Sequence, residues 1–279
     1  MAPVEFALQV LPSSIVARNM WGFSTKMFER NMFGKQNLAS FWSAAHHSGF
    51  AQEHPHATRM CWNRAIPFCI HGDGARAFKQ QKILILSWNP TLVRGCSWDT
   101  RFLYAVLPWE LLIPGVTLRQ LLTAFCDDVN DLQRGSHSGP WRFAFFGSKG
   151  DLEWMQEAYS LKHYYRCNLL CHRCFASQSH KDIDLLFTNL SEDAGWLSTM
   201  ISTLMFLQNA LKHRPLPPLC QVDGWSAQSM LWDSMHNIFL GIGQDILGSG
   251  LQLLCSIKYF GDFSTQEQLK VAHRALREF

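Results

Sequence analysis

Residues 66–78, with the sequence IPFCIHGDGARAF, decide how the fold is interpreted. The segment starts as a short apolar run, which is typical of a buried strand, and it reaches Asp73 between two glycines. An aspartate in this position has two interpretations. It can belong to a Gly-Asp-Gly turn, or it can be a carboxylate held at the end of a rigid strand for a metal ion.

The composition predicts a large buried core. The 279 residues suffice for one large domain or two ordinary ones. Charged residues make up 17% of the chain, below the roughly 25% of an average globular protein, and there are 11 tryptophans and 20 phenylalanines. The net charge is only +3 and no run of five like charges occurs, so any contact with DNA must be local.

The cysteines and the apolar runs indicate in which cellular compartment the protein is expected. The nine cysteines are odd in number and unevenly spread, and no leader sequence precedes them, which favours a reduced intracellular compartment. The longest apolar run, FLYAVLPWELLIPGV, is interrupted by Pro108, Glu110 and Pro114 and is too short to span a bilayer. We therefore expect a soluble protein without a membrane partner.

The hydrophobic pattern predicts an α/β fold. Residues 1–64 read as short helices and loops, and an amphipathic helix, VTLRQLLTAFCDDVNDLQRG, should begin at a capping box of Thr117 and Gln120 and end before Gly135. Another helix opens at DLEWMQEAYSL. The expected strands are short, hydrophobic and bounded by turn residues, at 65–72, 82–88, 101–107 and 141–147.

Three further helices are expected after a cysteine-rich segment. One runs from about 192 to 213, the next covers LWDSMHNIFLGIGQDILGSGLQLLC, and the last starts at a capping box of Ser264 and Glu267. Because no residue ends the last helix, we expect the natural protein to continue beyond it. The predicted division is an N-terminal segment (1–64), a core (65–165) and a mainly helical Cys/His-containing insertion (166–279).

Three strands, a helix and a fourth strand is the element order of an RNase H-like core. In such a sheet the first and fourth strands are neighbours, so Asp73, at the end of the first, and Asp151, just past the end of the fourth, should converge. Two convergent carboxylates suit a pair of Mg²⁺ or Mn²⁺ ions that activate the attacking oxygen and stabilise the leaving one. The alternative is that Asp73 belongs to a turn and Asp151 only caps the following helix.

A second constellation has the composition of a zinc site. Cys171 and Cys174 form a C-x-x-C pair, and Asp233 and His236 are spaced to project from one face of a helix. Together they offer four ligands, with Cys167 and His172 nearby. The alternative assigns the cysteines and His236 to the core and Asp233 to a helix cap.

Several of these segments together resemble a known family. IHGDG, ILILSWNPTLVRG, the Gly-Asp before a helix, LLCHRC and LWDSMHNIFLGIGQDILGSGL look like the catalytic region of the CACTA (En/Spm-like) DDE transposases, over roughly residues 60–255. The resemblance implies an RNase H-like fold that cleaves and joins DNA, with transposon ends as partner, Mg²⁺ or Mn²⁺ as cofactor and the nucleus as location. It leaves oligomerisation open.

Carried over by position, the resemblance assigns a role to each candidate residue. Asp73 and Asp151 would be the first and second catalytic aspartates, Cys171 and Cys174 the C-x-x-C pair, and Asp233 and His236 the later motif. The family also uses a glutamate after these motifs. Glu267 and Glu278 follow them here, on a helix that reads as amphipathic surface.

Basic residues near Asp73 would hold DNA through its phosphates, although each also fits a solvated surface. They are Arg76, Lys79, Lys82 and Arg94. Two other functions remain compatible with the sequence. One is a non-enzymatic, transposon-derived module that binds DNA or protein, and the other is an RNase H-like nuclease that cuts without joining ends.

Overall fold

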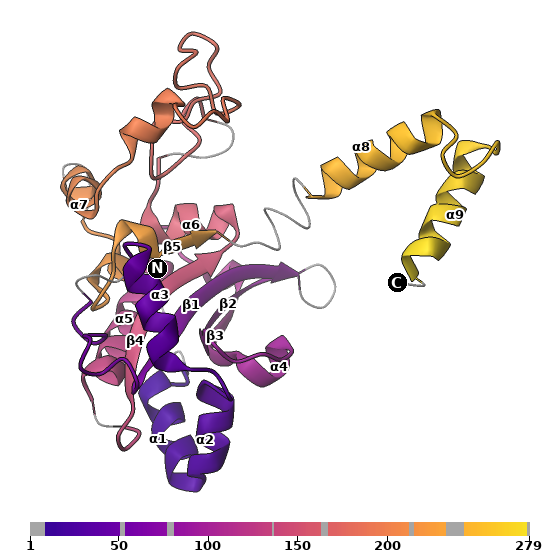
Figure 1. Cartoon of the computed structure of the whole chain (residues 1–279). Coiled ribbons are helices and arrows are strands. Elements are labelled where there is room, and N and C mark those ends of the chain that lie inside the picture. The colour runs from indigo at the N-terminus through magenta and orange to yellow at the C-terminus, as the bar shows by residue number, and fades with distance from the viewer. Residues whose placement is uncertain are drawn as a thin grey trace. The chain divides into compact units, whose positions relative to one another are not determined.

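The computed structural model of the chain describes residues 9–50, 54–76, 81–135, 137–162, 167–211, 215–232 and 243–277 (Figure 1). The chain divides into two compact units, Met1–Leu231 and Trp232–Phe279, and each is considered by itself. The first unit is an α/β structure built on a mixed five-stranded sheet, as the sequence predicted. No helix within the described ranges is both long and apolar enough to cross a membrane.

The elements of the first unit follow the predicted order. Three helices come first: α1 (Ser13–Phe23), α2 (Thr25–Met32) and α3 (Leu38–His47). The central part comprises β1 (Ala65–Arg76), β2 (Lys82–Pro90), α4 (Ser97–Thr100), β3 (Phe102–Pro108), the 3₁₀ turn η2 (Trp109–Leu111), α5 (Thr117–Arg134), β4 (Arg142–Gly150) and α6 (Leu152–Tyr159). The remainder comprises η3 (Gly195–Thr199), α7 (Thr203–Leu211), η4 (Pro218–Gln221), η5 (Ala227–Ser229) and β5 (Met230–Trp232).

The strands lie in the order β3-β2-β1-β4-β5. β1 pairs with β2, and β2 with β3, in antiparallel fashion, as expected for strands joined by short connections. β1 pairs with β4 in parallel, because α5 carries the chain back to the starting end of the sheet. The predicted adjacency of the first and fourth strands is therefore confirmed.

The two faces of the sheet have different coverings, because successive side chains of a strand point to opposite faces. Ile66, Phe68 and Ile70 of β1 lie in the main core, which also contains the buried faces of α5 and α6. Ala65, on the opposite face, packs with Trp42 of α3, whose indole Nε1 donates to the Ala65 carbonyl at 2.8 Å. Figure 1 shows α3 and α5 on opposite sides of the sheet.

A polar network ties four segments together. His54 Nε2 donates to the carbonyl of Phe145 in β4 at 2.8 Å, and its Nδ1 accepts the His56 N–H at 3.1 Å, which defines a neutral ring. Burial lowers the pKa of His54 to about 4. His56 also contacts the Asp223 carboxylate at 3.0 Å, and Arg134 of α5 binds that carboxylate with two 2.6 Å bonds.

Helix starts and ends differ from the predictions in three places. The predicted capping box of α5 is wrong, since Val116 is the N-cap and the Thr117 hydroxyl instead accepts the Ile113 N–H at 2.9 Å. The predicted start of the helix in LWDSMHNIF is also wrong. Residues 230–232 form strand β5, and residues 233–242 lie outside the described ranges.

The predicted helix at 192–213 is shorter than expected. Its first half is the 3₁₀ turn η3, and α7 starts only at Thr203. The helix does not start earlier because residues before Thr203 bond to other segments. The Ile201 N–H donates to the Arg173 carbonyl, and the Thr199 hydroxyl accepts the Phe175 N–H. These bonds fasten the stretch to the cysteine-rich segment instead of continuing the helix.

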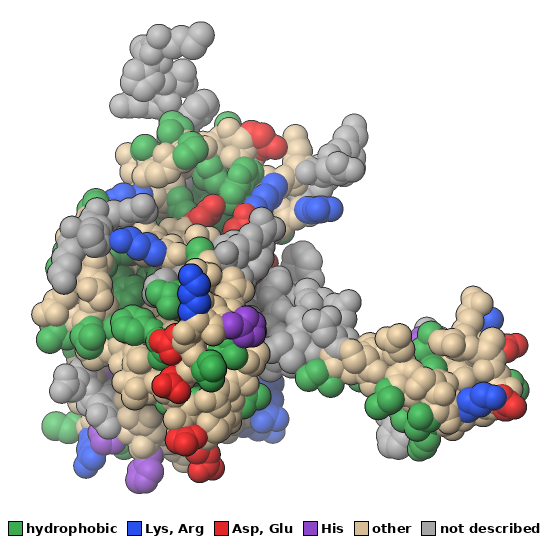
Figure 2. All heavy atoms as spheres, turned by 90° about the horizontal axis from the view of Figure 1, so that it is seen from above, with side chains coloured by type: hydrophobic (Ala, Val, Ile, Leu, Met, Phe, Trp, Pro, Cys, Tyr) green, Lys and Arg blue, Asp and Glu red, His purple; other side chains and the backbone are tan. Residues whose placement is uncertain are grey.

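The second unit contains α8 (Gly243–Ser256) and α9 (Thr265–Arg277). The predicted capping box of α9 is confirmed, since the Glu267 carboxylate accepts from both the hydroxyl and the N–H of Ser264 and the Ser264 hydroxyl accepts the Glu267 N–H. Figure 2 shows hydrophobic side chains on the surface of these helices. The exposed large hydrophobic side chains of this unit include Ile246, Leu247 and Leu253 of α8 and Ile257 just after it.

Candidate functional site

Asp73 lies inside a strand. β1 was predicted to end at residue 72, but it continues through Arg76, and Asp73 pairs with Ile85 of β2. The turn interpretation is therefore wrong. Neither flanking glycine has a positive φ.

The two glycines instead make room for large side chains on one face of β1. A Cβ atom on Gly72 would fall 1.9 Å from Cε2 of Trp154, and one on Gly74 would fall 2.7 Å from Cε of Lys82. Because side chains alternate along a strand, the half-buried Asp73 points to the opposite face.

Asp151 directly follows β4 and is the N-cap of α6. Its Oδ1 accepts the Trp154 N–H at 2.7 Å, which satisfies one of the amide groups that a helix start leaves unpaired. The prediction that Asp151 caps the following helix is therefore confirmed. This bond engages one of the two carboxylate oxygens, so capping does not exclude a second role for the other.

The strand register brings the two aspartates to the same edge of the sheet. The last pair of the parallel β1–β4 ladder is His71 with Lys149, two residues before each aspartate. The strands remain adjacent beyond this pair, since a Cβ on Gly150 would lie 2.5 Å from the Gly72 carbonyl oxygen. Asp73 therefore lies within β1 and Asp151 one residue beyond the end of β4, at the same edge of the sheet, where Asp151 lines a small pocket with Gly74, Lys82 and Trp154.

Charged groups surround Asp151 on α6. Glu153 and Glu157 lie one turn apart on this helix, and Lys82 of β2 donates to Glu153 at 3.2 Å while lying 3.8 Å from the centre of the Trp109 ring. Burial raises the pKa of the Glu157 carboxyl, and the charges of Glu153 and Asp151 raise it further while Lys82 lowers it. The sequence interpretation did not single out these glutamates, although their i, i+4 spacing after Asp151 was visible.

The C-x-x-C pair lies at the tip of a small hairpin. The hairpin is closed by a bridge between Leu169 and Ser177 and by the bond from the Leu170 N–H to the Ala176 carbonyl at 3.0 Å. Cys171 and Cys174 are brought into contact, with a hydrogen bond between their thiols. The sequence pattern predicted this proximity.

Backbone amides point at both sulfur atoms of the pair. The Arg173 N–H donates to Cys171 Sγ at 3.3 Å, and the Ala176 N–H donates to Cys174. Burial, with a smaller contribution from the neighbouring Cys171, raises the pKa of the Cys174 thiol to about 11. A bound cation would counter this effect and hold both groups as thiolates, so this half of a zinc site fits the metal.

The other half of the predicted zinc site, Asp233 and His236, lies outside the described residues. Within the described ranges, no group of three or more His, Cys, Asp or Glu side chains is arranged to hold a metal ion. Of the metal ligands predicted from the sequence, the described part of the chain therefore contains Asp73, Asp151, Cys171 and Cys174.

The other candidate residues have varied surroundings. Arg76 and Arg94 are exposed, Lys82 is held by Glu153 and Trp109, and Lys79 falls outside the described residues. On the face drawn in Figure 2, Lys and Arg side chains of the described residues are scattered and do not form one patch. Glu267 caps α9, and Glu278 also lies outside the described ranges.

Comparison with known proteins gives no family assignment. No protein-family model matches the chain, and no curated protein sequence matches it either.

Proposed function

We propose that this chain derives from a DDE transposase of the CACTA type and carries an RNase H-like catalytic core for metal-dependent cleavage and strand transfer of DNA. The observation that carries the proposal is that β1, which contains Asp73, and β4, which Asp151 directly follows, are neighbouring parallel strands, so that both aspartates lie at one edge of the sheet. Acidic residues at one edge of a rigid sheet form a preorganised place for hard divalent cations.

The sheet supports an RNase H-like core. Its order, β3-β2-β1-β4-β5, has an antiparallel three-stranded half and a parallel β1–β4 pair connected through α5. This is the arrangement that the resemblance implies, and it brings the first and fourth strands together. The hairpin that joins the thiols of Cys171 and Cys174 gives independent support, because the same family carries a C-x-x-C motif after the second aspartate.

In the proposed reaction, Asp73 and Asp151 hold the divalent ions. When bound, Mg²⁺ or Mn²⁺ would activate the attacking oxygen and stabilise the leaving oxygen. The attacking oxygen would come from water or from a DNA 3′ hydroxyl. Trp154 orients Asp151 through the bond from its backbone N–H. Arg76 and Arg94 are exposed near β1 and β2 and are available for phosphate contacts. The implied setting is the nucleus, with transposon ends as the partner.

A non-enzymatic DNA- or protein-binding module is the second candidate. It is favoured by one observation: among the described residues, no third acidic side chain joins Asp73 and Asp151 in a group that could hold a metal. Catalysis by two metal ions requires a complete ligand set, whereas binding of DNA does not.

The test measures stabilisation of the chain by Mn²⁺. A cation that binds only the folded state raises its stability by RT ln(1 + [L]/Kd), so the melting temperature should rise with Mn²⁺ concentration. The rise should be lost in Asp73→Asn and Asp151→Asn. It should persist in Asp127→Asn, a control that removes an exposed carboxylate of α5.

The same variants separate the two candidate functions. Mn²⁺-dependent cutting of DNA that is abolished by Asp73→Asn supports the enzyme. Stabilisation by Mn²⁺ that is equal in wild type and in all three variants would refute the aspartate site and leave the binding module as the better account.

A further inference from the structure

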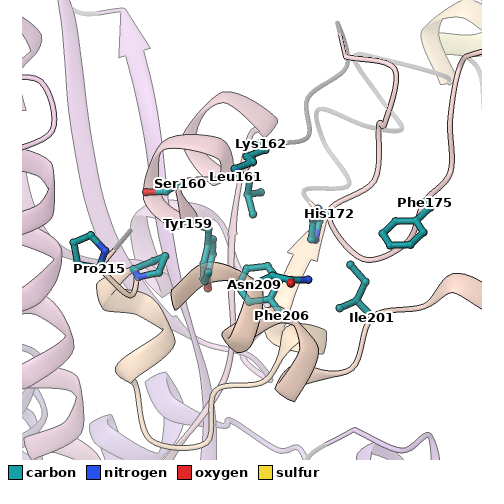
Figure 3. Close-up of a pocket in the computed structure, with 12 residues that line it drawn as sticks. Tyr159, Ser160, Leu161, Lys162, His172, Phe175, Ile201, Phe206, Asn209 and Pro215 are labelled. Carbon is teal, nitrogen blue, oxygen red and sulfur yellow. The ribbon is translucent and has the colours of Figure 1, made fainter. Parts of the chain in front are cut away.

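A pocket lies where the end of α6, the cysteine hairpin and α7 meet, within the first unit (Figure 3). Its volume is about 270 Å³. Tyr159 comes from the last residue of α6, Phe175 from the hairpin, and Phe206 and Asn209 from α7. Lys162 lies just beyond α6. His172, which lies between the two cysteines of the C-x-x-C pair, also lines the pocket, whereas neither cysteine and neither aspartate does.

Aromatic rings form the walls of this pocket, and two of them are held firmly. The buried Tyr159 hydroxyl is hydrogen-bonded to Ser148 Oγ at 2.5 Å and accepts from the Trp225 indole at 3.1 Å. Phe206 packs on the same indole, with ring centres 5.5 Å apart. Phe175 is 41% exposed. The pocket is therefore preformed for a flat, apolar ring rather than for a flexible chain.

Polar groups in the pocket suit the edge and the charge of a nucleotide. Asn209 is exposed on α7, and its amide offers both a donor and an acceptor, as the edge of a nucleobase requires. Lys162 is exposed beside Leu161 and supplies a positive charge for a phosphate. Figure 3 shows both side chains among the residues that line the pocket.

The size of the pocket favours one ring system. Pockets for drug-sized ligands enclose about 300–1,000 Å³, so this one, at about 270 Å³, falls just below that range. A single base with its sugar outside the pocket meets this limit. Stacking on aromatic side chains is sequence-tolerant, because every base has a π-face.

Helix α6 connects the pocket to the aspartate pair. Asp151 caps the start of this helix and Tyr159 ends it, so the rise of 1.5 Å per residue separates them by about 12 Å. With a spacing of about 3.4 Å per nucleotide along a stacked strand, this distance corresponds to about three or four nucleotides. A strand held at Asp151 is therefore long enough to present one of its bases to the pocket.

We infer that this pocket binds a single unstacked nucleobase of the DNA strand that the aspartate pair engages. The inference rests on the proposed function, since it takes DNA as the ligand. An extruded or single-stranded base stacks on Phe175 and Phe206, Asn209 hydrogen-bonds its edge, and Lys162 contacts a neighbouring phosphate. Single-stranded DNA enters at least cost, because extrusion from a duplex requires unstacking.

The experiment compares two single-stranded probes with the full chain. One is a short thymidine oligomer, and the other is an abasic oligomer of the same length, which carries the same phosphates without bases. Phe175→Ala should weaken binding of the thymidine oligomer by about 5- to 150-fold, since stacking contributes about 1–3 kcal/mol per base. The same variant should bind the abasic oligomer as wild type does.

Matched controls come from the same segments. Phe187 is 45% exposed and does not line the pocket, so Phe187→Ala should leave both affinities unchanged. Asn209→Ala should also weaken binding of the thymidine oligomer, whereas Gln208→Ala, at the adjacent exposed position of α7, should not. Both pocket variants remove exposed or half-exposed groups, and circular dichroism verifies that they remain folded.

The outcomes distinguish this inference from the proposed function. If wild type binds the thymidine oligomer and Phe175→Ala and Phe187→Ala behave alike, the pocket does not hold a base, and the aspartate site is unaffected by that result. If Phe175→Ala abolishes binding of an apolar naphthalene dye but not of the oligomer, the pocket takes an apolar small molecule and the inference is wrong. If wild type binds neither oligomer, the DNA partner of the proposed function fails as well.

Discussion

The indole ring of Trp154 lies directly against Gly72, where a Cβ atom would fall 1.9 Å from Cε2. The same indole lies close to Gly150, where a Cβ atom would fall 2.7 Å from Cε3. Trp154 therefore fastens α6 to both β1 and β4, the strands that lead to Asp73 and Asp151. Its own N–H donates to Asp151, so one residue sets the relative position of the candidate carboxylates.

Replacing Gly72 by alanine should destabilise the fold. The added methyl group has no room beside Trp154, and overpacking of a filled core costs about 1–3 kcal/mol or more. Urea unfolding measures the change. The control is Gly22→Ala in α1, where nothing lies within 4 Å of the new Cβ and a small gain in helix stability is expected.

A second substitution tests the cause of that loss. Trp154→Leu alone removes buried surface, but combined with Gly72→Ala it should cost less than the sum of the two single changes, because the clash is gone. Strict additivity in the double variant would show that the two side chains do not interact.

Asp151→Asn and Asp151→Ala should differ in stability. Asparagine caps helices about as well as aspartate, so Asp151→Asn should keep the bond to the Trp154 N–H and unfold near the wild-type urea concentration. Asp151→Ala should lose about 0.5–2 kcal/mol. Loss of stabilisation by Mn²⁺ in the asparagine variant, with its stability intact, would separate a metal ligand from a simple cap.

Zinc should copurify with the chain and depend on the hairpin cysteines. Cys171→Ser and Cys174→Ser should each lower the zinc content and the melting temperature, because structural zinc contributes folding free energy. Cys96→Ser, which changes an exposed cysteine hydrogen-bonded to Asp99, is the control and should change neither. A wild-type protein without zinc, with a melting point indifferent to chelator, would contradict the zinc site.

Stability should fall between about pH 6.5 and pH 4 because of His54. Its pKa is about 4 in the folded chain and near 6.5 when unfolded, so the unfolded state binds the proton first as the pH drops. The neutral ring therefore contributes its full stabilisation above pH 6.5 and loses it progressively down to pH 4, by an amount on the order of 3 kcal/mol.

Urea unfolding at several pH values checks this dependence. His54→Gln keeps a donor and an acceptor but cannot titrate, so the slope across this window should flatten. His47→Asn on the exposed surface of α3 should retain the wild-type slope. Asp223, whose pKa is lowered by Arg134 and His56 against the effect of its burial, loses its contribution only below about pH 4 and does not confuse the result.

The strands were predictable because each is a short apolar run between turn residues, and all four start within one residue of the expected position. The continuation of β1 through Asp73 was not predictable, since Gly-Asp-Gly has the composition of a turn. Its cause is the packing of Trp154 and Lys82, which are distant in sequence. The prediction of a helix at 192–213 was wrong for a similar reason, because hydrogen bonds to Arg173 and Phe175 replace helical hydrogen bonds.

In the candidate site, too, some features could be predicted from the sequence and others could not. Adjacency of β1 and β4, the strands that place the two aspartates at one edge of the sheet, follows from element order, and contact of Cys171 with Cys174 follows from their spacing. The surroundings of Asp151 do not follow from local patterns, because Lys82 reaches Glu153 across the sheet. The pocket at Tyr159 likewise combines residues from three separate segments.

The most direct measurement of the central claim is a crystal structure of the full chain with Mn²⁺ that locates the ion by anomalous scattering. We predict an anomalous peak at a bonding distance of about 2 Å from a carboxylate oxygen of both Asp73 and Asp151. A peak that touches only one of them, or a well-ordered pair of carboxylates with no ion between them at saturating Mn²⁺, would contradict the proposed catalytic site.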